Sequence, residues 1–198
     1  MRVRPATSAD DESLLVLWNQ VATYDFMSTR LFEEKIHNDP EATTLVAETR
    51  GHPFGFATVV ARNLTDEVRG IIKLIAVAGD AQRRGVGTLL LHEAELELGR
   101  RGAKSVRVGE SFPNYLTPGV DVRYSPARNF FTSHGYVHFA EAVNLEVDLD
   151  EWPAPRDRRR SLAAGTTIRR ATRDVSSAIA DLISTHWPPW WGEVSQAL

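Results

Sequence analysis

The stretch 81-AQRRGVGTLLL-91 lies where a predicted strand gives way to a predicted helix. The apolar run 71-IIKLIAVA-78 precedes it and is typical of a strand that is buried on both faces. Beyond the stretch, apolar residues recur at helical spacing from Val86 to Arg101. Two glycines and two arginines therefore stand at the first turn of a helix, shortly after a buried strand.

This arrangement of residues is suited to an anion. The first turn of a helix presents backbone N–H groups that have no helical acceptor, together with a partial positive charge. Gly85 and Gly87 carry no Cβ, so a ligand can approach the backbone closely. Arg83 and Arg84 can add charge-assisted hydrogen bonds. The stretch therefore predicts a phosphate or pyrophosphate site.

The glycines have three other interpretations. A Walker A loop needs lysine after its second glycine, but Thr88 and Leu89 follow here, which excludes it. A dinucleotide fingerprint needs a third small residue where Leu90 stands, although Glu110 falls where a ribose-binding acid would lie. The dinucleotide interpretation therefore stays open as a weaker alternative. A tight turn with no ligand is the third.

The composition is that of an ordinary globular protein. The chain has 198 residues, of which 42% are hydrophobic and 25% charged, and its net charge is −3. This charge favours neither nucleic acid nor a membrane surface as a partner. The chain has no cysteine, so disulfides and thiolate chemistry are excluded. The segment 1-MRVRPATSAD-10 has no apolar signal core, so we expect a cytoplasmic protein.

Periodicity and turn residues predict alternating strands and helices in one α/β domain over residues 1–149. We expect Ser8 to cap the first helix. We also expect two closing strands between Tyr136 and Leu149. The other expected strands are 2–7, 44–50, 54–62, 71–78 and 104–110, and the expected helices are 8–21, 28–39, 86–101 and 126–134.

The C-terminal part of the chain differs in character. Residues 150–166 are rich in Pro, Arg and Asp and are expected to form a linker. Residues 167–198 form an arm whose strand-then-helix pattern resembles residues 3–18, as if a second copy of the domain began there. The aromatic cluster 187-WPPWW-191 is expected to be buried, either against the domain or in a homodimer.

Two motifs together resemble one family. Residues 82-QRRGVG-87 match the pattern Gln/Arg-x-x-Gly-x-Gly/Ala, the acyl-CoA motif of the GCN5-related N-acetyltransferases. Residues 127-ARNFFTSHGY-136 are similar to the family's Ala-x-x-x-Tyr-x-x-x-Gly-Phe. The resemblance covers residues 2–149 and implies an α/β fold with a mixed, mostly antiparallel sheet. Helices flank that sheet, and its strands splay apart at the cofactor site.

The resemblance implies acetyl-CoA as co-substrate. The backbone amides from Arg84 to Thr88 would hold its pyrophosphate, and Ile75 and Val77 would pair with its pantetheine arm. The cofactor-binding residues expected from the resemblance are Ile75, Val77, Gln82, Arg83, Arg84, Gly85, Val86, Gly87, Thr88, Asn129 and Phe131.

The expected reaction is direct attack of a neutral amine on the thioester in a ternary complex. Glu110 is the first candidate for the general base, and Asp121 is the second. The family's frequent general acid is a tyrosine, but Phe131 occupies that position. Tyr115 is the first substitute; Tyr124, Ser125 or water are others. The remaining alternative is a non-catalytic acyl-CoA-binding or interaction module.

The acceptor is expected to be a primary amine of a small molecule or peptide. Residues 112–121 resemble an insertion seen in some bacterial members of the family, including tandem ones. The candidate acceptor-binding residues are Tyr24, Phe26, Phe112 and Asp121. The six histidines form no ligand pattern, since Gly135 interrupts the helix that would align His134 with His138, and no metal site is expected.

Overall fold

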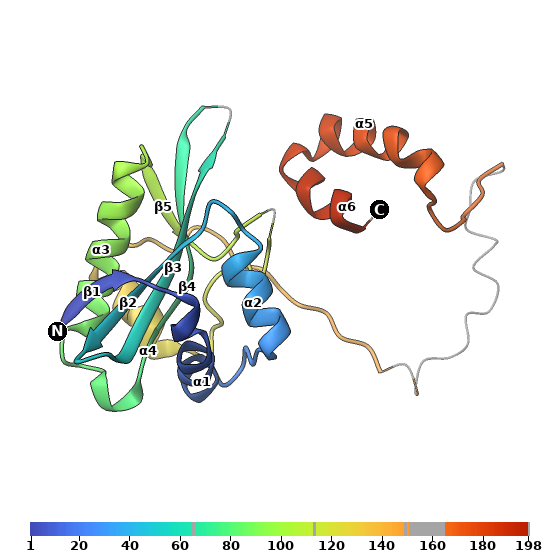
Figure 1. The fold of residues 1–198 in the computed structure, drawn as a ribbon. Helices are drawn as coiled ribbons and strands as arrows, with labels where there is room; N and C mark the ends of the chain where they lie inside the picture. Colours follow the sequence, from blue (N-terminus) through green and yellow to red (C-terminus); the bar gives the residue numbers. More distant parts are fainter. Residues whose placement is uncertain (65, 113, 149, 151–164, 198) are drawn as a thin grey trace.

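The computed structural model describes residues 1–64, 66–112, 114–148, 150 and 165–197. Its centre is a five-stranded sheet with the strand order β1-β2-β3-β4-β5 (Figure 1). All neighbouring strands are antiparallel except the last pair, β4 and β5, which are parallel. The mixed, mostly antiparallel sheet that the sequence predicts is therefore confirmed. The strands are β1 (Arg2–Pro5), β2 (Thr43–Thr49), β3 (His52–Asn63), β4 (Val68–Val77) and β5 (Ser105–Val108).

Six α-helices are found in the described part of the chain. The helix α2 is capped by Ser28, whose hydroxyl accepts from the backbone N–H of Leu31. The first helix is not capped by Ser8 as expected. A 3₁₀ turn over Ser8–Asp10 precedes it, and the carboxylate of Asp10 accepts from the backbone N–H of Thr7. The helices are α1 (Asp11–Val21), α2 (Thr29–His37), α3 (Val86–Arg100), α4 (Ser125–Ser133), α5 (Ser176–His186) and α6 (Trp191–Ala197).

The helices cover both faces of the sheet, so that two hydrophobic clusters form. One cluster joins α1 and α2 to the sheet through residues such as Trp18, Phe32 and Phe56. The other joins α3 and α4 to the opposite face through residues such as Leu90 and Phe131. Alternation of side chains along each strand supplies the two faces. The first 135 residues thus form a three-layer domain.

A β-bulge at Lys73 interrupts this alternation in β4. Val59 pairs with Ile72 and Thr58 pairs with Leu74, so Lys73 has no residue opposite it on β3. The extra residue changes the face to which the following side chains point. Ile72 therefore packs with α3, whereas Leu74 packs with α1 and α2. The bulge lies at the point where β4 extends beyond the end of β5.

Two predicted strand regions are wrong. Residues 136–148 contain no strand, and their apolar side chains are exposed, with Leu145 94% exposed. Residues 166–172, expected to begin like a strand, are also irregular, although the predicted helix after them is present as α5. A strand is stable only when a neighbour pairs with its backbone. In the part of the chain that the structure describes, no strand lies beside these segments.

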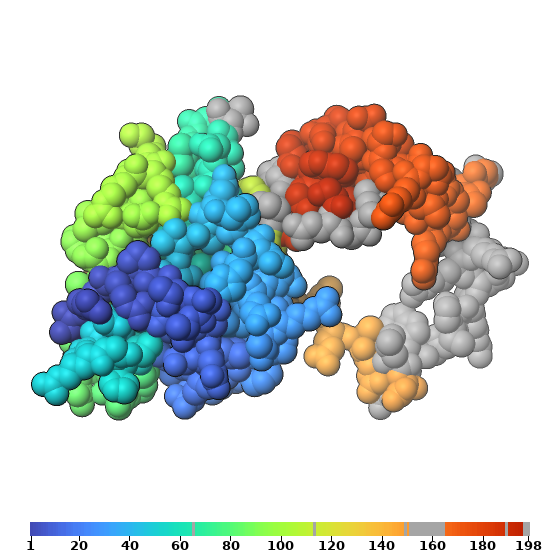
Figure 2. Space-filling model, in the orientation of Figure 1, coloured from blue at the N-terminus to red at the C-terminus, as the bar shows by residue number. Residues whose placement is uncertain are grey.

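The C-terminal arm lies to one side of the domain. Figure 2 shows it in orange and red, beside the body formed by the blue to green segments. Trp187 and Trp190 remain about half exposed, so the domain does not bury these two side chains, and their burial in a homodimer stays a prediction. Most of the predicted linker, residues 151–164, lies outside the described residues.

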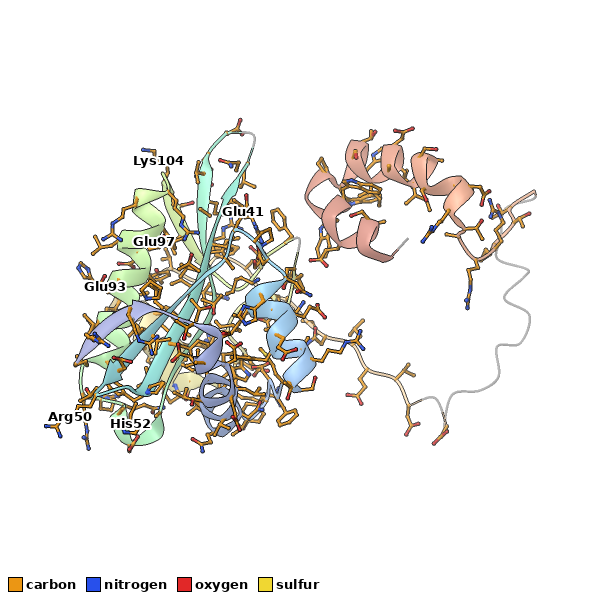
Figure 3. All side chains as sticks on the ribbon, in the orientation of Figure 1. Glu41, Arg50, His52, Glu93, Glu97 and Lys104 are labelled. Atoms are coloured by element: carbon orange, nitrogen blue, oxygen red, sulfur yellow. The ribbon has the colours of Figure 1, made fainter. Side chains whose placement is uncertain are left out.

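Charged side chains cover the outside of the domain, and Figure 3 labels Arg50 and His52 at the tip of the β2–β3 hairpin. Among the helices that the structure describes, none is long and apolar enough to cross a membrane.

Candidate active site

The strands β4 and β5 separate at the bulge. Their pairing ends with Ile72 opposite Val108, after which the backbone N–H of Gly109 still donates to the carbonyl of Ile72. The rest of β4, residues 74–77, keeps its pairing with β3 on the other side. The outer edge of this segment has no neighbouring strand in the described residues. Ile75 and Val77 lie on it and are partly exposed.

The helix α3 begins at the end of this open edge. Gly85 precedes the helix with φ of +82°, a conformation that favours glycine, and nothing lies within 4 Å of the position that a Cβ would take. The N–H groups of Val86, Gly87 and Thr88 are in the first turn and have no acceptor within the helix. The side chains of Arg83 and Arg84 are exposed beside them. These features fit an anion that binds at the start of α3.

Three of the expected cofactor residues have structural contacts at this turn. The side-chain amide of Gln82 donates to the carbonyl of Val77 at 2.9 Å and so fixes the turn to the end of β4. A Cβ on Gly87 would lie 3.3 Å from the ring of Phe130, so this glycine lets α4 pack closely against α3. The hydroxyl of Thr88 is 3.1 Å from Nε2 of His134. The start of α3 is therefore held by both β4 and α4.

The two expected cofactor residues on α4 lie in different environments. Asn129 is exposed. Phe131 is 6% exposed and packs edge-on against Phe130 and Tyr136, within the cluster beneath α3. Its side chain is a core residue, in the cluster against which Ile75 and Val77 pack.

The two catalytic candidates lie close together. Glu110 follows β5, and its carboxylate accepts from the guanidinium of Arg107 at 3.0 Å. Burial, and to a smaller extent the negative charge of Glu110, raises the pKa of the Tyr115 hydroxyl. The carbonyl of Tyr115 accepts from Nζ of Lys35 at 2.8 Å. A carboxylate therefore lies at the point where β4 and β5 separate, and Tyr115 lies in the loop that follows.

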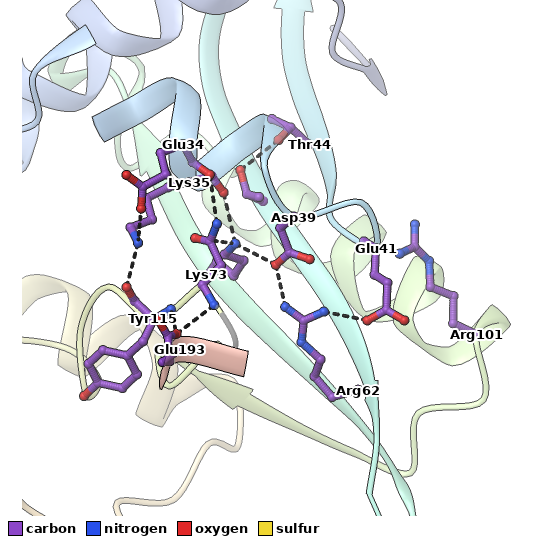
Figure 4. A network of polar contacts seen from close by, with 12 residues as sticks. Glu34, Lys35, Asp39, Glu41, Thr44, Arg62, Lys73, Arg101, Tyr115 and Glu193 are labelled. Atoms are coloured by element: carbon purple, nitrogen blue, oxygen red, sulfur yellow. Dashed lines mark hydrogen bonds and ion pairs between the residues drawn. The ribbon is translucent and has the colours of Figure 1, made fainter. Parts of the chain in front are cut away.

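A buried polar network lies behind these residues (Figure 4). The ammonium of Lys73, whose side chain is 1% exposed, donates to the carbonyl of Lys35 and to the carboxylate of Asp39. It also lies 3.4 Å from Oδ1 of Asn114. Arg62 donates to the same carboxylate oxygen of Asp39. Burial lowers the pKa of Lys73, whereas the hydrogen bonds from Arg62 and Lys73 outweigh burial and lower the pKa of Asp39.

A narrow hollow, too small to hold a water molecule, lies between the network and the end of β5. The hydroxyl of Ser111 is buried beside it and has no hydrogen-bond partner in the described part of the chain. A buried hydroxyl without a partner is costly. The hollow is lined by Lys35, Lys73, Leu74, Gly109, Glu110, Ser111, Leu116 and Thr117.

The residues predicted to bind the acceptor are only partly brought together. The guanidinium of Arg123 lies 3.9 Å from the ring centre of Tyr24 and also pairs with the carboxylate of Asp121. The hydroxyl of Tyr124 accepts from the backbone N–H of Tyr24, and the two rings are 5.2 Å apart. Arg123 therefore joins Tyr24 to Asp121 in one cluster.

This pairing weakens Asp121 as a base, because the hydrogen bonds from Arg123 lower its pKa to about 2. Phe26 is exposed and Phe112 is partly exposed. Neither ring makes an aromatic contact with this cluster in the described residues.

Several residues of the site were missed by sequence reasoning. Lys73 stands within an apolar run, and only its isolation as a cation in that run could have marked it. Two of the chain's three lysines, Lys35 and Lys73, are buried here, which their number alone does not predict. Arg123 and Glu193 carry no local pattern that would assign them to a site. The described residues contain no group of three or more His, Cys, Asp or Glu residues arranged to hold a metal ion.

Comparison with known families gives a match over the centre of the chain. The model of the acetyltransferase (GNAT) domain matches residues 40–138, which is half of the 198 residues. This range includes β4, the turn before α3, and α4. The fold is also not the mostly parallel, doubly wound sheet of dinucleotide-binding domains, which removes that alternative. No curated protein matches the sequence.

Solved structures share the fold at low sequence identity. One is described as a GCN5-related glucosamine N-acetyltransferase region of a fungal multi-domain GH3 β-N-acetylglucosaminidase. It has 19% identity and a TM-score of 0.83. The match covers 98% of this chain but only 24% of the fungal chain.

Two shorter proteins match over their whole length. An aminoglycoside 6'-N-acetyltransferase from Acinetobacter haemolyticus has 17% identity and a TM-score of 0.57, covering 76% of this chain and 100% of its own. A ribosomal-protein-alanine N-acetyltransferase from Brucella melitensis has 13% identity and a TM-score of 0.58, covering 74% and 100%.

Proposed function

Because the chain belongs to the GNAT acetyltransferase family, we propose that it transfers an acetyl group from acetyl-CoA to a primary amine by direct attack. The observation that carries the proposal is the open edge of β4, which leads to the unpaired amides at the start of α3. An extended ligand with a pyrophosphate at one end fits this combination. Acetyl-CoA supplies the activated acyl thioester.

The cofactor side of the site follows from the backbone. The amides of the first turn of α3 bind the pyrophosphate, assisted by Arg83 and Arg84. The free edge of β4 around Ile75 and Val77 offers backbone groups to the amides of the pantetheine arm. Gln82 and Gly87 act indirectly, because they hold the turn against β4 and α4.

The chemistry uses Glu110, which lines the hollow, and Tyr115, in the loop that follows it. Glu110 accepts a proton from the acceptor amine, whose lone pair attacks the thioester carbonyl and forms the C–N bond. As the C–S bond breaks, the sulfur leaves with the electron pair and takes a proton from the hydroxyl of Tyr115. A tyrosine hydroxyl is protonated at neutral pH at its ordinary pKa of about 10, and burial raises the pKa of Tyr115 further.

The acceptor proposed for the first test is an amino sugar. Tyr24 and Tyr124 present aromatic surface of the kind that packs against sugar rings, beside the charged pair of Arg123 and Asp121. The fungal region that matches 98% of this chain is described as a glucosamine N-acetyltransferase. An aminoglycoside and a peptide with N-terminal alanine are the next acceptors, since two other structural neighbours are named for them.

One observation favours a second candidate, a non-catalytic acyl-CoA-binding or interaction module. Phe131 stands where the family frequently has its catalytic tyrosine, and its ring is buried in the core. Such a module would bind CoA but would transfer no acetyl group.

The first experiment is a calorimetric titration of the protein with acetyl-CoA, followed by an assay of CoA release with glucosamine, kanamycin and an alanyl peptide. Micromolar binding with CoA release supports the acetyltransferase. Binding with no turnover on any of the three amines favours the non-catalytic module. Absence of binding at millimolar acetyl-CoA would remove both.

A further inference from the structure

Among the described residues, the C-terminal arm contacts the domain at the loop after β5. Glu193, in the first turn of α6, uses one carboxylate oxygen to accept two hydrogen bonds from the domain. The donors are consecutive backbone amides: the N–H of Asn114 at 2.8 Å and the N–H of Tyr115 at 2.6 Å. Figure 4 shows the start of α6 beside this loop. Residues almost 80 positions apart in sequence are thereby joined.

A second contact from the arm reaches the same loop. The ring of Trp190 lies 5.5 Å from the ring of Tyr115, measured between their centres. The ring contact from Trp190 and the charge-assisted hydrogen bond to Glu193 thus both act on Tyr115. Both come from the segment between Trp190 and Ala197, which forms the end of the arm.

The loop is also held from the side of the domain. Lys35 donates to the carbonyl of Tyr115, and the side-chain amide of Asn114 donates to the carbonyl of Glu34 at 2.9 Å. Asn114 has φ of +104°, an unfavourable conformation for a residue with a side chain. Such a conformation persists only where surrounding contacts enforce it. The arm supplies one acceptor, the carboxylate of Glu193, for the backbone amides of Asn114 and Tyr115, which α2 does not contact.

We propose that Glu193 is a positioning residue for acetyl transfer: its carboxylate fixes the Asn114–Tyr115 backbone and thereby the position from which the Tyr115 side chain acts. The inference rests on the proposed function, because it gives the arm a part in the same site. The cofactor turn at the start of α3 is built by β4 and α4, with no contribution from the arm in the described residues. The arm therefore controls the acceptor and proton-transfer side alone.

The test compares three full-length variants. Glu193→Ala removes the acceptor of both amides, whereas Glu193→Gln keeps an oxygen acceptor of nearly the same shape without the charge. Asp181→Ala is the matched control, since it removes an acidic side chain from α5, another helix of the same arm. The readouts are amide hydrogen exchange of residues 111–117, the Kd for acetyl-CoA, and kcat and KM with glucosamine, kanamycin and an alanyl peptide.

For Glu193→Ala we expect faster exchange at Asn114 and Tyr115 and a decrease in kcat/KM for the amine of about 10- to 100-fold. The Kd for acetyl-CoA should stay within about twofold of wild type, because the cofactor turn is separate. Glu193→Gln should recover most of the activity, since a neutral hydrogen bond keeps about half the strength of a charged one. Asp181→Ala should match wild type in every readout.

Failure of the proposed acetyltransferase function and failure of the positioning role of Glu193 would give different results. If wild type binds acetyl-CoA but releases no CoA with any amine, the proposed function fails and the positioning role fails with it. If wild type is active and Glu193→Ala exchanges faster at the two amides without loss of kcat/KM, the positioning role alone is overturned. Unchanged exchange in Glu193→Ala, with wild-type activity, would show that the arm does not hold the loop at all. An equal loss in Asp181→Ala would overturn the specific role of Glu193 and assign the effect to the arm's stability.

Discussion

The ammonium of Lys73 lies 2.8 Å from the carboxylate of Asp39, and both side chains are almost completely removed from solvent. Lys73 is the extra residue of the β4 bulge, so its side chain leaves the alternation of the strand and points to the chain segment after α2. The pair therefore connects the strand that opens the site to the helix that carries Lys35. Arg62 shares the same carboxylate, which places two cations around one anion.

Removal of Asp39 should be costly, because it leaves Lys73 buried with no opposite charge. For Asp39→Ala we expect the free energy of unfolding to fall by about 3–5 kcal/mol, measured by urea denaturation. The double variant Asp39→Ala/Lys73→Met should regain part of this loss, since it also removes the stranded charge. Asp80→Ala, on an exposed turn, should change the value by less than about 0.5 kcal/mol. An Asp39→Ala protein as stable as Asp80→Ala would contradict the buried pair.

Stability should also decrease in acid, because two carboxylates, those of Asp10 and Asp39, have lowered pKa values in the folded protein. Hydrogen bonds from Arg4 lower the pKa of Asp10, and those from Arg62 and Lys73 lower that of Asp39, from an ordinary value of 3.8. A pKa that is lower in the folded state means that protons bind the unfolded chain more tightly. The stabilisation is present above the unfolded pKa and is lost as pH falls through the folded one.

The corresponding measurement is the urea midpoint at about pH 7, 5, 4 and 3. We expect a small change between the first two and a progressive decrease below about pH 5. Asp10→Asn should be less stable than wild type at neutral pH and should lose less stability on acidification. An acid dependence that is the same in wild type and Asp10→Asn would show that the Arg4–Asp10 pair does not contribute.

The sequence was a good guide where a pattern is local. The helix from Val86 and the left-handed glycine before it follow from periodicity and from the backbone freedom of Gly85, and the structure has both. The three antiparallel strands before them were also predicted within a few residues. These elements form the open edge of β4 and the start of α3, so both could be located from sequence.

The acceptor side could not be located in this way, because its contacts join distant segments. Lys73 depends on Asp39 and Asn114, which are 34 and 41 residues away, and Glu193 contacts Tyr115 from 78 residues away. No periodicity records such pairings. The strands predicted between Tyr136 and Leu149 are wrong for a related reason. Alternation of apolar and polar residues shows which side chains would share a face, but it does not show which strand would pair with the segment.

That failure leads to a prediction about the alternating side chains of residues 137–147. Val143 and Leu145 are largely exposed, so their replacement by serine removes little buried surface. We expect Val143→Ser and Leu145→Ser to change the free energy of unfolding by less than about 0.5 kcal/mol in urea denaturation. Leu90→Ser, in the core beneath α3, is the control and should cost several times more. A loss of more than about 2 kcal/mol for Leu145→Ser would mean that another chain segment covers it.

The cofactor turn can be tested with two glycines that share one conformation. Gly85 and Gly51 both have φ of +82°, and neither has an atom within 4 Å of the place where a Cβ would lie. Alanine at either site should therefore cost about 1–2 kcal/mol of stability through backbone strain alone. Only Gly85 lies at the start of α3, whereas Gly51 is in the β2–β3 hairpin between Arg50 and His52 (Figure 3).

Calorimetry with acetyl-CoA should then separate the two. We expect Gly85→Ala to raise the Kd about tenfold or more, equivalent to about 1.4 kcal/mol, while Gly51→Ala leaves it unchanged. Equal Kd values for the two variants would place the pyrophosphate elsewhere. A parallel thermal melt checks that the strain is similar in both.

The identity of the proton donor can be tested by removing the hydroxyl of Tyr115. Tyr115→Phe keeps the ring against Trp190 and keeps the backbone carbonyl that Lys35 binds, so its structural effect should be small. If Tyr115 protonates the leaving sulfur, kcat should fall about 100-fold or more, the usual contribution of a general acid. Tyr136→Phe is the control, since the Tyr136 hydroxyl donates to the carboxylate of Glu95 on α3.

Phe131→Tyr, the reverse substitution, should not restore activity to Tyr115→Phe. The Phe131 ring is buried between Phe130 and Tyr136, so a new hydroxyl there would have to be desolvated. We expect a loss of about 1–3 kcal/mol in stability and no gain in kcat. If Phe131→Tyr instead raises kcat while Tyr115→Phe has no effect, the proton donor belongs on α4, and Tyr115 serves only to anchor the arm.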